Sequence, residues 1–170
     1  MNPTLAILTI GVVPVSEIMP LLAGQVPEDQ IKHISLMGSL TREEAMEEYG
    51  VEPGHDVMLT LLSNREIVQV SRQKTEQALQ SAIEVLDNQG YDVILLMSTF
   101  RFTHLHARNA ILLEPQRIIP PLVASIVDGH QVGVIVPLAE LLASQEEKWA
   151  LLENPPLYAL ANPVSGTEQQ

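Results

Sequence analysis

Residues 91–99 (YDVILLMST) constrain the fold more than any other stretch of the chain. This run of large aliphatic side chains follows a long amphipathic segment, 72–88, and a glycine, Gly90, that stops a helix. An apolar run in that position is typical of a buried parallel strand. The run ends in Met97, Ser98 and Thr99, at the carboxyl end of the predicted strand, where α/β proteins usually bind their ligands.

Short apolar runs and helical patterns alternate along the rest of the chain. Thr41, with Glu44 three residues later, forms a capping-box pattern, and Ser71 is the expected N-cap of the longest helix. The predicted strands are 5–10, 31–36, 57–62, 67–70, 91–97, 132–136 and 157–160, and the predicted helices are 15–23, 41–49, 72–88, 122–127 and 138–152. Residues 63–66 are expected to join two strands as a hairpin. This order predicts an α/β fold with a mostly parallel sheet flanked by helices.

Composition excludes several classes of function. The net charge is −12, and the nine Lys and Arg residues are scattered, so no basic surface for nucleic acid is expected. The chain has no cysteine, which excludes disulfides, thiolate catalysis and cysteine-based metal sites. No apolar stretch approaches the ~20 residues that span a bilayer, and no signal peptide is visible. We therefore expect a cytoplasmic protein with no membrane partner.

The chain contains a weak internal echo. LAILTI-GVVPVSEIMPLL reads as strand, proline-containing turn and helix, and VGVIV-PLAELL repeats that order. A further short strand follows each run. Either the chain holds two related lobes, or two ordinary strand–helix units happen to look alike.

Four stretches carry a resemblance to a known family. They are LAILTIGVVP at 5–14, VSRQKTEQALQSAIEVLDNQGYDVILLMST at 70–99, ARNAILLEPQRIIPPLVASI at 107–126 and HQVGVIVP at 130–137. In them the chain resembles the AroM family of the aspartate/glutamate/hydantoin racemase superfamily. The resemblance implies an Asp/Glu racemase-like fold of two α/β lobes with a ligand cleft between them. It divides the chain into an N-terminal lobe, 1–115, and a linker with the beginning of a second, incomplete lobe, 116–170.

The same resemblance shapes the expected chemistry. Racemases of the superfamily carry a cysteine motif at a strand end in each lobe, of which the first reads Cys, Asn or similar, then Thr. The matching residues in this chain are Met97, Ser98 and Thr99, and the second cysteine would lie beyond residue 170. Thiol-based racemisation is therefore not expected. The family name reflects an association with genes of aromatic amino-acid biosynthesis.

The candidate ligand-binding residues are Gly11, Ser98 and Thr99, followed by Ser63 and Asn64. Gly11 permits close approach of a ligand to the backbone, or simply a turn. Ser98 and Thr99 can bind a carboxylate through hydroxyl and backbone N–H groups, or cap the strand in a local turn. Ser63 and Asn64 also fit a plain polar turn. The pair His104 and His106 lacks a fixed third ligand, so no metal is expected, and no cofactor is expected either.

The sequence supports three functional hypotheses. The first is a protein that binds a small carboxylate-bearing metabolite. The second is an isomerase, racemase or lyase with non-thiol acid and base groups, which requires titratable residues near Ser98. The third is a fragment of a longer protein whose uncovered second lobe drives homodimer formation or aggregation.

Overall fold

The computed structural model describes residues 4–161, apart from the side chain of Val15. The chain divides into two compact units, Met1–Glu114 and Pro115–Gln170, and each is described by itself. None of the helices within residues 4–161 combines the length and the apolar character needed to cross a bilayer.

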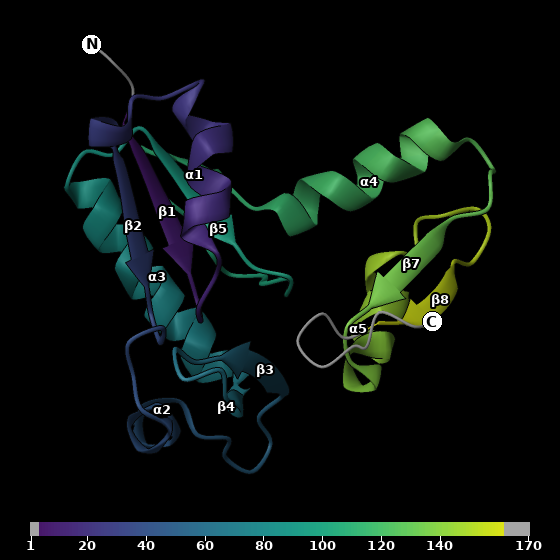
Figure 1. The fold of residues 1–170 in the computed structure, drawn as a ribbon, viewed down its shortest axis with the longest axis horizontal. Coiled ribbons are helices and arrows are strands. Elements are labelled where there is room, and N and C mark those ends of the chain that lie inside the picture. Colours follow the sequence, from purple (N-terminus) through teal and green to yellow (C-terminus); the bar gives the residue numbers. More distant parts are fainter. Residues whose placement is uncertain (1–3, 162–170) are drawn as a thin grey trace. The chain divides into compact units, whose positions relative to one another are not determined.

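Unit 1 is built on a four-stranded sheet with the order β2-β1-β5-β6 (Figure 1). The strands are β1 (Leu5–Thr9), β2 (Ile31–Ser35), β5 (Val93–Met97) and β6 (Ile111–Leu113), and every neighbouring pair is parallel. All five residues of β1 are buried, as expected for a central strand with a partner on each edge. The predicted α/β fold with a mostly parallel sheet is therefore confirmed.

Helices cover both faces of this sheet. On one face, α3 (Arg72–Asn88) packs Leu79 and Ile83 into a core that includes Leu8 and Ile94. On the other face, Ile7 and Thr9 are buried, and Figure 1 places α1 (Val15–Ala23) there. Alternate residues of β1 thus serve two separate packing layers, because side chains alternate along a strand.

The connection from β2 to α3 carries a small accessory layer. Helix α2 (Arg42–Tyr49) begins at Thr41, and the capping box with Glu44 is present. Strands β3 (Val57–Leu61) and β4 (Ile67–Ser71) then form the predicted antiparallel hairpin. Helix α3 follows directly, with the Ser71 hydroxyl accepting from the Lys74 amide at 3.1 Å. Both predicted caps are confirmed, and both helices keep their predicted ends to within one residue.

Unit 2 contains α4 (Pro115–Val127), β7 (Gly133–Val136), the 3-10 turn η2 (Ala139–Leu141), α5 (Leu142–Lys148) and β8 (Leu157–Leu160). Strands β7 and β8 come before and after α5 in the sequence and pair in parallel with each other. Strands β1 and β2 are arranged in the same way around α1. Both halves of the sequence echo therefore fold as β–α–β units.

Two predicted helices have the wrong bounds. The helix predicted at 122–127 begins seven residues earlier, and the pair Pro120-Pro121 lies inside it. Pro115 occupies the first helical position, where a missing N–H costs nothing, so it is the proline that marks the start. The helix predicted over 138–152 reduces to η2 and α5, which ends at Lys148. Neither η2 nor α5 has a side-chain cap at its start, so no local signal extends the helix.

Strand β6 was not predicted. It has only three residues, too few to show alternation, and its place is set by pairing of Val93–Leu95 with Ile111–Leu113. Pairing of this kind depends on a strand that is distant in the sequence, so the local sequence does not predict it.

The α3 interface should dominate the stability of unit 1. Ile83→Ala removes a fully buried side chain and should lower the free energy of unfolding by about 2–5 kcal/mol, because transfer and cavity terms add. Val85→Ala, on the exposed side of the same helix, is the matched control and should change it by less than about 0.5 kcal/mol. Urea denaturation followed by circular dichroism measures both, and equal effects would contradict the packing described here.

Candidate functional site

The order of strands reverses between β1 and β5. From β1 the chain moves outward to β2, and from β5 it moves outward in the opposite direction to β6. The connections that leave β1 and β5 at their carboxyl ends therefore separate, one running to each side. In open α/β sheets such a switch point is where ligands bind, in the crevice outside the carboxyl ends of the two strands. We take the carboxyl ends of β1 and β5 as the candidate site.

Sheet register fixes which residues meet at this edge. Thr9, the last residue of β1, is aligned with Ser35 of β2 on one side and with Met97 of β5 on the other. Gly11 and Val12 follow β1, and Ser98 and Thr99 follow β5. The structure thus places the predicted residues Gly11, Ser98 and Thr99 just after the carboxyl ends of the two strands that flank the switch point.

Gly11 is held in a tight backbone contact. It is buried, and a Cβ atom built there would lie 2.3 Å from the Thr60 hydroxyl and 2.4 Å from the Leu61 carbonyl oxygen. The next amide, that of Val12, donates to the same Leu61 carbonyl at 2.8 Å. The Gly11 carbonyl accepts from the Ser35 hydroxyl at 3.0 Å. Packing against β3 therefore accounts for the glycine, and contact with a ligand stays a prediction.

Ser98 and Thr99 differ in what they already bind. The Ser98 hydroxyl accepts from the Phe100 amide at 3.1 Å, so Ser98 forms the local turn that the sequence allows as the alternative to a ligand contact. Thr99 is exposed, and its side chain makes no hydrogen bond within residues 4–161. A hydroxyl oxygen accepts two bonds and donates one, so Ser98 keeps its own proton for a ligand while it holds the turn.

Positive charge lies beside this turn, and sequence reasoning missed it. Arg72, at the start of α3, donates a guanidinium N–H to the carbonyl of Arg101. The amino end of α3, with its partial positive charge, therefore adjoins the loop that follows β5. The signal was a cation directly after the predicted N-cap Ser71, but its position beside residues 98–101 depends on the strand order.

Ser63 and Asn64 lie in the hairpin turn between β3 and β4. The Asn64 side chain donates to the Glu66 carboxylate at 2.8 Å and accepts from the Glu66 amide at 3.0 Å. Arg65 has a positive φ of 67°, as tight turns often require. Ser63 and Asn64 are both exposed, and the bonds to Glu66 account for Asn64 as a turn residue. A ligand contact at either position stays a prediction.

His33 lies in β2, the strand that pairs with β1. The His33 ring Nε2 and the buried Thr9 hydroxyl are 2.9 Å apart, and burial lowers the pKa of His33, which favours the neutral imidazole. His33 is paired with Ile7, which is in turn paired with Leu95 of β5. Two strand spacings, about 10 Å, therefore separate its backbone from β5. Met97 itself has a thioether, which neither gives nor takes a proton at neutral pH.

Polar side chains of α3 fix the loop that leaves the site. The Glu76 carboxylate accepts from the amides of Thr103 and His104, at 2.9 and 2.8 Å. Gln80 accepts from the His106 amide at 3.0 Å, one turn further along the helix. Spacings of four and seven residues place Glu76, Gln80 and Asp87 on one side of α3, so a single helix face holds residues 103–110.

Asp87 is the strongest of these attachments. Its carboxylate accepts from the amides of Arg108, Asn109 and Ala110, the shortest at 2.7 Å. These backbone bonds, led by that of Ala110, lower the pKa of Asp87 because they stabilise the ionised form. We call this set of bonds between the Asp87 carboxylate and the amides of residues 108–110 the Asp87 clamp. It lies immediately before β6 and therefore positions that short strand.

Two other groups of polar residues have a structural explanation. The Ser71 hydroxyl lies 2.8 Å from His55 Nδ1, which looks like a nucleophile with its base, but Ser71 is fully buried and caps α3. His104 lies in an exposed loop, 3.6 Å from Glu76. Within residues 4–161, no three His, Asp or Glu side chains are grouped so that they could hold a metal ion.

Comparison with known proteins gives one match. The family model described as AroM protein matches residues 5–170. No curated protein and no solved structure matches the chain significantly.

The Asp87 clamp should make stability depend on acid pH. Its pKa is lower in the folded state than the value of about 3.9 in unfolded chains, so its contribution is complete above that value and disappears as pH falls through the folded pKa. Asp87→Asn should therefore lower the melting temperature most near pH 7, and the difference from wild type should shrink below about pH 4.

Glu84→Gln, on the same helix, is the control and should keep the pH dependence of wild type. Melting temperatures of the three proteins between pH 3 and pH 7 measure the effect. A difference between Asp87→Asn and wild type that stays constant over this range would contradict the role given to the carboxylate.

Proposed function

Because the chain belongs to the AroM family and brings Gly11, Ser98 and Thr99 to one switch point, we propose that it binds a small carboxylate-bearing metabolite there. The observation that carries the proposal is the strand order β2-β1-β5-β6, since it starts the loops after β1 and β5 side by side at a switch point, where α/β proteins bind their ligands. The proposal concerns unit 1 alone.

The charges at the edge suit an anion. Arg72 and the amino end of α3 adjoin the turn at Ser98, and the exposed Arg101 belongs to the same loop. The net charge of −12 opposes the approach of an anion, but distant charges are screened beyond about 8 Å at physiological ionic strength. The nearby cations therefore have the larger effect on an anion at this site. A carboxylate would accept from Thr99, from Ser98 and from backbone N–H groups of the turn.

Binding is favoured over thiol-type racemisation by the residue at the end of β5. Racemisation needs two groups that exchange protons on opposite sides of one carbon, and Met97 cannot serve as either. His33, a titratable group of the neighbouring strand β2, contacts Thr9 rather than the turn at Ser98. A role in aromatic amino-acid metabolism is part of this proposal and rests on the family alone.

A thermal melt against dicarboxylates, amino acids and shikimate-pathway intermediates tests the proposal. A compound that binds only the folded state adds about 2.7 kcal/mol of stability at a hundredfold excess over its dissociation constant. We expect one compound class to raise the melting temperature of wild type. Thr99→Val keeps the size of the side chain and should remove most of that increase, since a hydroxyl contact to the carboxylate is lost.

Ser81→Ala is the matched control, because Ser81 is an exposed hydroxyl on α3 that donates only to Gln77. Each variant is compared with its own ligand-free melting temperature, so a change of intrinsic stability does not count. A ligand that stabilises Thr99→Val and Ser98→Ala as much as wild type would disprove binding at this edge.

A further inference from the structure

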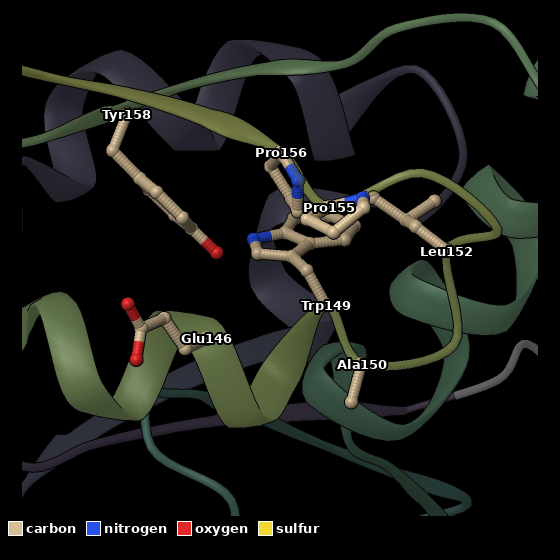
Figure 2. Close-up of a pocket in the computed structure, with 7 residues that line it drawn as sticks. All are labelled: Glu146, Trp149, Ala150, Leu152, Pro155, Pro156 and Tyr158. Atoms are coloured by element: carbon tan, nitrogen blue, oxygen red, sulfur yellow. The ribbon is translucent and has the colours of Figure 1, made fainter.

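Unit 2 contains a cavity of about 390 Å³ that the proposed function does not use. It is lined by α5, by the turn that follows it and by β8, and its walls include Trp149, Pro155, Pro156, Tyr158 and Glu146 (Figure 2). Its volume lies in the range of small-molecule sites, and it combines an apolar wall with few polar groups, as such sites do.

The aromatic wall is suited to a cation. The Trp149 Nε1–H donates to Gln145 at 3.2 Å, so the polar edge of the indole is already hydrogen-bonded. The Lys148 ammonium already lies 5.1 Å from the centroid of that ring. Positive charge is attracted to the face of an aromatic ring, and Trp is the strongest of the three aromatic types.

Two polar groups face each other across the cavity. The buried Tyr158 hydroxyl oxygen has no hydrogen-bond partner within residues 4–161, and it points into the space towards the Glu146 carboxylate (Figure 2). Burial, and then the negative charge of Glu146, raise the pKa of Tyr158, so the phenol stays protonated. The carboxylate only accepts and the phenol oxygen can accept, so a ligand that bonds to both oxygens must supply hydrogen-bond donors, and a cationic donor best matches the carboxylate.

We propose that this cavity binds a primary alkylammonium group, which donates to Glu146 and Tyr158 while its aliphatic chain packs against Trp149 and the two prolines. A quaternary ammonium has no N–H and would leave both oxygens unpaired. The alkylammonium group can come from a free amine or from a lysine side chain of another protein.

The chain offers a direct probe, because Trp149 is its one tryptophan. Titration with n-butylammonium at pH 7 should give a saturable change in tryptophan fluorescence, whereas neutral 1-butanol should not. Tetramethylammonium should bind at least about tenfold more weakly, since it cannot donate to the two oxygens. Butanol that saturates at the same concentrations as n-butylammonium would overturn the proposal.

Glu146→Gln is the variant that tests the recognition, and Glu147→Gln is its matched control on the next residue of α5. Both side chains are exposed, so both variants should fold as wild type does. Glu146→Gln should weaken n-butylammonium binding about tenfold, and Glu147→Gln should not. Equal affinities of the two variants, or no saturable change in wild type, would overturn the proposal.

A second titration identifies the source of the amine. Nα-acetyl-lysine amide presents the same ammonium group as a protein side chain. Tighter binding of this compound than of n-butylammonium supports a lysine of a partner protein, and the reverse supports a free amine. A failure in unit 1 leaves this result untouched, since the two sites share no residue.

Discussion

The pairing of β1 on both of its edges is the constraint on which unit 1 depends. Its five residues are buried, and it lies between β2 and β5 in a parallel sheet. One set of alternate side chains packs against α3, and the other set, with Ile7 and Thr9, fills the opposite layer. Since β1 and β5 are parallel neighbours, the loops that leave them start side by side at the carboxyl ends of the strands before they diverge. The same arrangement presses Gly11 against Leu61, which excludes any larger residue there.

Local signals in the sequence predicted much of the fold. Helix α3 was predicted with its observed bounds because Ser71 caps it and its apolar residues recur at helical spacing. Thr41 and Glu44 marked the start of α2 in the same way. Strand β6 could not be predicted, because three residues carry no pattern and pairing with β5 decides its place. The start of α4 was assigned to the wrong prolines, since Pro115 and the pair Pro120-Pro121 give competing signals.

The candidate site was likewise predictable only where local sequence determines it. The polar ending of β5 at Ser98 and Thr99 was visible in the sequence, because it interrupts an apolar run. Its neighbours were not, since the approach of Arg72 and the alignment of Thr9 with Met97 depend on the order of strands far apart in the chain. Non-local pairing thus turns a polar strand end into a switch-point site with positive charge beside it. The missing thiol at Met97 then favours recognition of a ligand over proton transfer.

The central claim is that ligand binding is located at the carboxyl edge of β1 and β5. Amide chemical-shift mapping by ¹⁵N–¹H NMR during titration with a stabilising carboxylate tests it most directly. We predict that the largest shifts occur at Val12, Ser98, Thr99 and Phe100. Shifts confined to the opposite edge, where Gln30, Lys32 and Tyr91 line a cavity of about 300 Å³, would contradict it.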